Sequence, residues 1–198
     1  MSPVSGTEKT LGDLTEAELV AIARARDGRS QAAFRALYDR FAGEVLALLF
    51  PLLRDRDLAE DVLQEAFFRI HVSLDRYDAT RSFRPWLYQI ARNAAADSLR
   101  SRKKADHALA GARDPRPAED EAGAGAARRE DEELAARALG SLPEDLRALL
   151  VQRHALEMTL AELAESWSCA ERTITTRLRE AAGLFAQAVS LLRPRKRT

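Results

Sequence analysis

Residues 159–179, TLAELAESWSCAERTITTRLR, decide how the C-terminal part of the chain folds. Thr159 and Glu162 have the spacing of a capping box, which predicts a short helix that ends near Trp167. Apolar residues at positions 160, 163, 164 and 167 fall on one face of that helix. Ser168-Cys169-Ala170 then makes a tight connection, and the pattern predicts a second helix over residues 171–192.

The second of these helices carries a polar stripe opposite its apolar one. Periodicity turns apolar side chains inward at positions 174, 178, 181 and 185. Arginine can pair with both acceptors of guanine, and threonine offers hydroxyl and methyl contacts to bases. The pattern indicates a helix-turn-helix that enters the major groove, although a plain helical hairpin fits it as well. The stripe consists of Arg172, Thr175, Thr176 and Arg179.

The rest of the chain also has helical periodicity, so we expect an all-α fold. Helices are predicted over residues 16–27, 30–50, 57–74 and 85–103, with a capping box at Thr15 and a stop at Pro51. Between 105 and 130 the sequence is rich in Ala, Gly, Pro and charge, which predicts a flexible linker. We therefore expect two small helical domains, over 15–104 and 131–192, with a disordered N-terminus at 1–14 and a basic tail at 193–198.

Composition excludes several classes of protein. Hydrophobic residues make up 46% of the 198 and charged residues 31%, so a packed core is expected. The longest apolar run, residues 45–53, is too short to insert in a membrane, and the N-terminus has no signal-peptide pattern. The single cysteine, Cys169, rules out a disulfide framework, and a cytoplasmic protein is expected. The three histidines lack ligand spacing, and no phosphate loop or nucleophile motif occurs, so we expect no metal, no cofactor and no enzyme.

Charge is unevenly spread although the net charge is zero. Residues 57–78 hold six acids and two bases, whereas residues 81–104 hold seven bases and one acid. An acidic helix face followed by a basic one suits a protein with two unlike partners. A solvated surface with no partner is the plainer interpretation of either face.

Both halves of the chain resemble one family. The stretches DVLQEAF (61–67), FRPWLYQIARN (83–93) and DSLR (97–100) resemble the second conserved region of bacterial RNA polymerase sigma factors. Leu142-Pro143, Arg147 and residues 159–179 resemble the fourth region, although Ser168 stands where relatives usually have glycine. With only these two regions and a short linker, the chain is similar to the extracytoplasmic-function (ECF) group.

The resemblance implies a role for each half. In relatives the third helix binds a coiled coil on the largest catalytic subunit of core RNA polymerase. The turn after that helix and the basic helix that follows open promoter DNA at the minus-10 element and hold an unstacked base. The residues implied for the polymerase are Asp57, Asp61, Gln64, Glu65 and Phe68, and those for the minus-10 element are Arg81, Arg84, Trp86, Gln89, Arg92, Asn93 and Arg100.

Further expectations concern the other half and the partners. The stripe of Arg172, Thr175, Thr176 and Arg179 is expected to contact the minus-35 element. The acidic linker resembles the segment that relatives thread toward the RNA exit channel. Relatives are commonly held inactive by an anti-sigma protein, so the partners implied are core polymerase, promoter DNA and an anti-sigma factor. The alternative is a stand-alone helix-turn-helix regulator that binds operators without polymerase.

Overall fold

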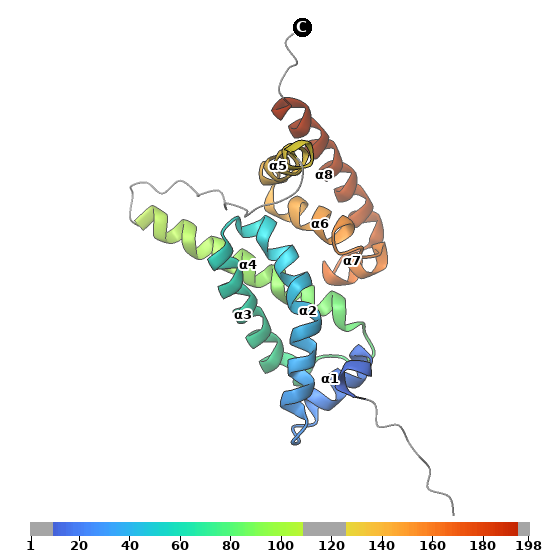
Figure 1. Cartoon of the computed structure of the whole chain (residues 1–198). Helices are drawn as coiled ribbons and strands as arrows, with labels where there is room; N and C mark the ends of the chain where they lie inside the picture. The colour runs from blue at the N-terminus through green and yellow to red at the C-terminus, as the bar shows by residue number, and fades with distance from the viewer. Residues whose placement is uncertain (1–9, 109–125, 194–198) are drawn as a thin grey trace, which may run out of the picture.

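The computed structural model describes residues 10–108 and 126–193, and every regular element in these ranges is helical (Figure 1). The predicted all-α fold is confirmed. The N-terminal lobe comprises η1 (Leu11–Asp13), α1 (Glu16–Arg24), α2 (Ser30–Leu53), α3 (Arg56–Ser73), η2 (Leu74–Arg76) and α4 (Phe83–Ala108). The C-terminal lobe comprises α5 (Ala126–Gly140), α6 (Glu144–His154), α7 (Leu160–Ser166) and α8 (Glu171–Leu192).

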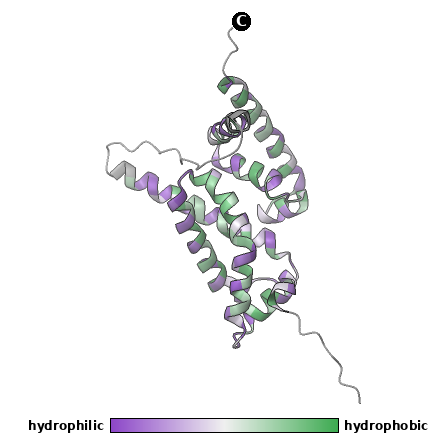
Figure 2. Ribbon diagram, in the orientation of Figure 1, coloured by the Kyte–Doolittle hydropathy of each residue, from purple (hydrophilic) through white to green (hydrophobic). Residues whose placement is uncertain are grey.

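Helix α2 is the centre of the N-terminal lobe, where it packs against α1, α3 and α4. Its buried side chains include Leu37, Phe41 and Leu48, which recur at the spacing of one helical face. Figure 2 shows that the C-terminal half of α2 is predominantly hydrophobic, whereas the outer part of α4 is hydrophilic. Within the described ranges, no helix is both long and apolar enough to cross a membrane.

Two predicted helix starts are present as capping boxes. The Glu18 amide donates to Thr15 Oγ1 at 3.3 Å, and the Thr15 amide donates to Glu18 Oε2 at 2.7 Å. The same pair of bonds joins Thr159 and Glu162, at 3.2 and 2.8 Å. Each box satisfies amides that would otherwise lack a partner, and it fixes where α1 and α7 begin.

The prediction that Pro51 ends the second helix is wrong, because α2 continues to Leu53. Proline lacks an amide hydrogen, so it removes one backbone hydrogen bond of the last turn. Leu52 and Leu53, only 2% and 6% exposed, pack into the core and keep this turn helical. The helix then ends at Arg54, whose φ of 54° lies in the left-handed region.

The predicted linker and N-terminus are shorter than expected where the structure describes them. Helix α4 extends to Ala108 and α5 begins at Ala126, so helices enter both ends of the segment 105–130. A 3-10 turn occupies Leu11–Asp13, and Leu14 is buried in the core. Arg40 donates to the carbonyls of Gly12 and Leu14 and so ties this segment to α2. Residues 1–9, 109–125 and 194–198 lie outside the described residues, and the predictions for them stay untested.

The two lobes share one hydrophobic core. A single cluster of buried residues joins α1–α4 to Leu149, Met158, Leu163 and Ile174 of the C-terminal lobe. Helix α2 packs against α6, and α4 packs against α7. A second, smaller cluster lies within the C-terminal lobe, among Leu142, Leu146, Leu150 and Ala181.

Arg147 joins the two lobes by hydrogen bonds at the end of α2. Its Nη1 donates to the carbonyls of Pro51 and Leu52, each at 3.2 Å. Its Nη2 donates to the carbonyls of Gly140 and Leu142 at 3.0 and 2.8 Å. The carbonyls of a last helical turn have no partner in their own helix, so this guanidinium serves as a cap supplied by another lobe.

We expect Arg147→Met to lower the free energy of unfolding by about 2 kcal/mol, because methionine replaces the stem but leaves buried carbonyls unpaired. Arg153→Met removes a single bond, from Arg153 Nη1 to the carbonyl of Met158, and should cost about 1 kcal/mol. Urea denaturation of both variants measures the difference. Equal losses would contradict the capping role of Arg147.

Candidate functional site

One face of α3 exposes the side chains predicted to bind polymerase. Phe68 is 63% exposed and Val72, one turn further on, is 62% exposed. Large apolar side chains with this exposure gain nothing from the fold of their own chain, which favours a partner surface. The structure brings all five predicted residues together on this exposed face: Asp57, Asp61, Gln64, Glu65 and Phe68.

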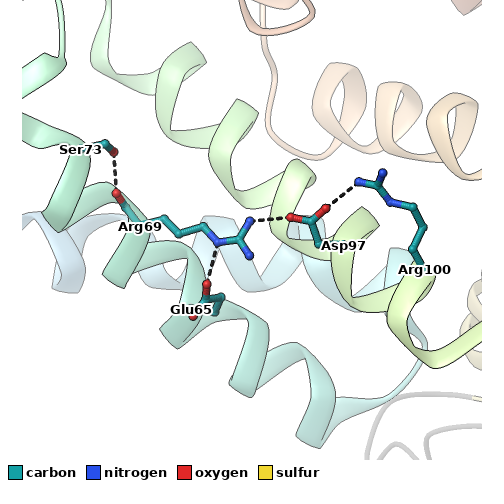
Figure 3. A network of polar contacts seen from close by, with 5 residues as sticks. All are labelled: Glu65, Arg69, Ser73, Asp97 and Arg100. Carbon is teal, nitrogen blue, oxygen red and sulfur yellow. Dashed lines mark hydrogen bonds and ion pairs between the residues drawn. The ribbon is translucent and has the colours of Figure 1, made fainter. Parts of the chain in front are cut away.

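A chain of ion pairs links this face to α4 (Figure 3). Arg69 Nε donates to Glu65 at 2.7 Å, and Arg69 Nη1 donates to Asp97 at 2.7 Å. Arg100 donates to the other oxygen of Asp97 at 2.6 Å. The hydrogen bond from Arg69 is the main reason why the pKa of Asp97 lies below its usual value. Asp97 therefore orients two arginines, Arg69 of α3 and Arg100 of α4.

The C-terminal lobe contacts several of the residues predicted for the minus-10 element. Arg81 forms an ion pair with Glu165 at 2.8 Å, and Gln89 donates to Ser168 Oγ at 3.3 Å. Arg84 donates to the carbonyl of Leu156 at 2.8 Å. By contrast, Asn93 and Arg100 are exposed. The predicted residues lie on α4 and the turn before it. Arg84, Gln89 and Arg92 are half-buried, whereas Arg81 is exposed although it is paired with Glu165.

Arg92 is the most enclosed of these residues. Its guanidinium carbon lies 3.9 Å from the centre of the Trp167 ring, and Nη2 donates to the carbonyl of Ser166 at 3.0 Å. Nη1 is buried and has no hydrogen-bond partner among the described residues. The pKa of Arg92 is lowered to about 10, mainly by burial and in smaller part by the nearby positive charge of Arg177. The group stays protonated near neutral pH, so the charge is held in a site that no carboxylate neutralises.

The turn before α4 borders an open pocket of about 640 Å³. The Thr80 amide and hydroxyl both donate to Asp78, and the Tyr77 hydroxyl donates to the carbonyl of Arg81, so the turn is held in shape. Helix α1 and Arg40 of α2 form the opposite side of the pocket. Trp86 packs against Tyr77 and Phe83 and is half-buried, so it is part of an aromatic cluster as well as a candidate for base stacking.

Helices α7 and α8 form the predicted helix-turn-helix. The predicted inward residues Ile174 and Ala181 are fully buried, and the stripe of Arg172, Thr175, Thr176 and Arg179 is exposed. Ser168, in the turn, has a φ of 51°. This left-handed conformation is the one that glycine adopts without strain, which explains why glycine suits this position.

Sequence reasoning missed the residues that join the lobes. Periodicity placed Trp167 on the apolar face of the short helix, and its Nε1 does donate to Gln152 at 2.7 Å. The opposing Arg92 belongs to a helix far away in the chain, and no spacing rule relates the two. Arg81 likewise pairs with Glu165, and Arg84 donates to the carbonyl of Leu156, across such separations in the sequence. Helix α4 is rich in arginine and also carries apolar positions. This combination was the sequence feature that could have indicated that another part of the chain packs against it.

Comparison with known proteins agrees with this architecture. The family model for Sigma-70 region 2 matches residues 37–105, which include α3 and the basic part of α4. The chain is 32% identical over 174 residues to the ECF RNA polymerase sigma factor RpoE of Cereibacter sphaeroides, an alignment that covers 86% of this chain and 94% of the relative. It is 40% identical over 68 residues to the ECF sigma factor SigM of Bacillus subtilis, covering 34% of this chain and 41% of SigM.

A solved structure has the same fold. It is the sigma factor RpoE of Bartonella quintana in complex with the anti-sigma factor NepR, at 22% identity and a TM-score of 0.68, over 81% of this chain and 98% of that one. The chain spans less than half the length of the first curated relatives that it matches. The match to the Cereibacter protein, however, extends over both lobes, and from it we conclude that this chain belongs to the ECF family of RNA polymerase sigma factors.

Proposed function

We propose that this chain binds core RNA polymerase and directs it to promoters, with no catalysis of its own. The observation that carries the proposal is the exposed acidic and apolar face of α3, next to a basic α4, in a chain of this family. A stand-alone regulator would use the helix-turn-helix but would leave both of these surfaces without a role. The proposed site of action is the cytoplasm, where polymerase and DNA meet.

The α3 face supplies the contact with polymerase. Carboxylates of Asp57, Asp61 and Glu65 complement a basic coiled coil, and Phe68 provides apolar area at the centre of the contact. Such a centre is desolvated on binding and contributes more than the charged rim. We assign this face to the largest catalytic subunit on the basis of the family resemblance.

The turn before α4 and the pocket beside it hold the unstacked base of the minus-10 element. The pocket is open to solvent and has Arg24, Arg40 and Arg81 around its edge, so cations surround an opening large enough for a base. Guanidinium groups bind phosphates, and the polar groups of Thr80 and Ser82 offer hydrogen bonds to a base edge. Asn93 and Arg100 extend the same surface along α4.

Helix α8 contacts the minus-35 element through its exposed stripe. The hydroxyls of Thr175 and Thr176 donate to carbonyls one turn back, at 3.0 and 2.9 Å. Both threonines are exposed, and their hydroxyl oxygens keep lone pairs that can accept hydrogen bonds from DNA, while Arg172 and Arg179 supply charge and donors. An anti-sigma protein is the proposed regulatory partner, by analogy with the Bartonella complex.

We expect the double variant Asp61→Lys, Gln64→Lys to bind core RNA polymerase about thirtyfold more weakly, since like charges then oppose a basic surface at a cost of about 2 kcal/mol. Pull-down with purified core enzyme and run-off transcription measure binding and activity. The matched control is Gln31→Lys, Asp39→Lys, which makes the same charge change at exposed positions of α2. Undiminished assembly of the α3 variant would overturn the proposed function.

We expect Arg172→Ala and Arg179→Ala each to weaken promoter binding by the polymerase complex by about 1–3 kcal/mol, the value of a bidentate base contact. Both side chains are exposed, so the fold should be unaffected. Footprinting and mapping of transcription start sites provide the measurement, with Arg35→Ala on the exposed side of α2 as control. An unchanged promoter profile in both variants would remove α8 from recognition.

A further inference from the structure

The open pocket beside the turn before α4 contains one acidic side chain. The walls of this pocket are formed by the start of α1, by Arg40 of α2 and by residues of the turn 77–83. Three arginines line it, Arg24, Arg40 and Arg81, but among the described residues of its lining Glu16 is the single carboxylate. Phosphates are bound by the arginines and not by an acid, so Glu16 must serve a different part of a ligand.

Glu16 lies near two arginines but is bonded to neither. Arg40 donates to two backbone carbonyls before α1, at 3.2 and 2.9 Å, and Arg84 donates to Glu44 and to a backbone carbonyl of the C-terminal lobe. Glu16 accepts no hydrogen bond from the described residues. Burial raises the pKa of Glu16 more than the charges of these arginines lower it, as expected for a carboxyl group without bonded donors. Its oxygens can therefore accept hydrogen bonds from a ligand.

The backbone on both sides of the pocket is fixed by hydrogen bonds. Glu16 is the first residue of α1, and the capping box of Thr15 and Glu18 holds that turn of the helix. Arg40 ties the segment before α1 to α2. The opposite wall is held by the hydrogen bonds within the turn 77–83. A polar group on a fixed backbone can discriminate between ligands that differ by one hydrogen-bonding group.

We propose that Glu16 determines which base the pocket accepts: it selects an unstacked base that carries an exocyclic amino group, and it rejects thymine. The identification of the ligand as a base of promoter DNA rests on the proposed function. The role of Glu16 rests on the lining of the pocket and on the unbonded carboxylate.

The selectivity follows from the chemistry of the four bases. An ionised carboxylate accepts hydrogen bonds and donates none. Adenine, cytosine and guanine each carry an amino group that donates, and an unstacked base has lost the Watson–Crick partner of that group. Thymine has no amino group, and its one ring N–H lies between two carbonyl oxygens that a carboxylate repels. A site whose polar group is left unpaired by one ligand discriminates against that ligand.

Glu16 contributes selectivity and not overall affinity. Its negative charge opposes the phosphates of DNA, while Arg24, Arg40 and Arg81 around the same pocket attract them. An interaction that weakens binding in general but penalises one base in particular is typical of a specificity determinant.

The test uses the chain assembled with purified core RNA polymerase. The probe is a fluorescein-labelled promoter, obtained by start-site mapping, whose minus-10 element is single-stranded and carries each of the four bases at each position in turn. At one position we expect thymine to bind about tenfold more weakly than the preferred base, a difference of about 1.4 kcal/mol. Analogues that lack only the amino group should bind as weakly as thymine there: 2-pyrimidinone for cytosine, purine for adenine and hypoxanthine for guanine.

Glu16→Gln keeps the size of the side chain and adds a donor, so that thymine is accepted as well. We expect the ratio of affinities between the preferred base and thymine to fall from about ten to about two. A general loss of stability or affinity cancels in this ratio, since both affinities are measured with the same variant. The control Glu133→Gln makes the same substitution at an exposed position of α5 and should leave the ratio at about ten.

Two outcomes overturn the proposal. One is a set of ratios that Glu16→Gln leaves unchanged at every position of the element, and the other is equal binding of the preferred base and its analogue without the amino group. The proposed function fails in a different way: the unmodified chain then does not assemble with core polymerase, or the assembled complex binds none of these DNAs.

Discussion

The pairing of Arg147 with the open carbonyls at the end of α2 is the interaction on which the architecture depends. Pro51 removes one hydrogen bond from the last turn of α2, and a helix end leaves further carbonyls without partners. Placing that end in the protein interior therefore requires a donor from elsewhere. Arg147 supplies it, and in doing so it orients α6, which in turn positions α7 over α4.

Separation of charge along the chain becomes separation of surfaces in the fold. Glu65 of α3 and Arg100 of α4 belong to one network, with Arg69 and Asp97 between them (Figure 3). Arg69 is shared by a carboxylate on each side, so a change at the α3 face alters the bonding available to α4. This network is partly exposed, and its energetic weight is accordingly modest.

The sequence predicted those features that depend on residues within a single helix. The capping boxes at Thr15 and Thr159, the buried positions of α8 and the exposed α3 face all follow from spacing within one helix. The continuation of α2 beyond Pro51 did not follow, because burial of Leu52 and Leu53 outweighs a local rule. The contact of α7 with α4 could not be predicted either, since Arg92 and Trp167 meet only through the packing of two lobes. The exposed and buried faces of single helices were thus accessible to sequence reasoning, and the contacts between the lobes were not.

Ser168 illustrates how local and distant requirements conflict at one residue. Its φ of 51° favours glycine, yet its hydroxyl oxygen accepts a hydrogen bond from Gln89. Glycine there would relax the backbone of the turn. It would also delete the acceptor of the hydrogen bond from Gln89 and so weaken the contact between the two lobes.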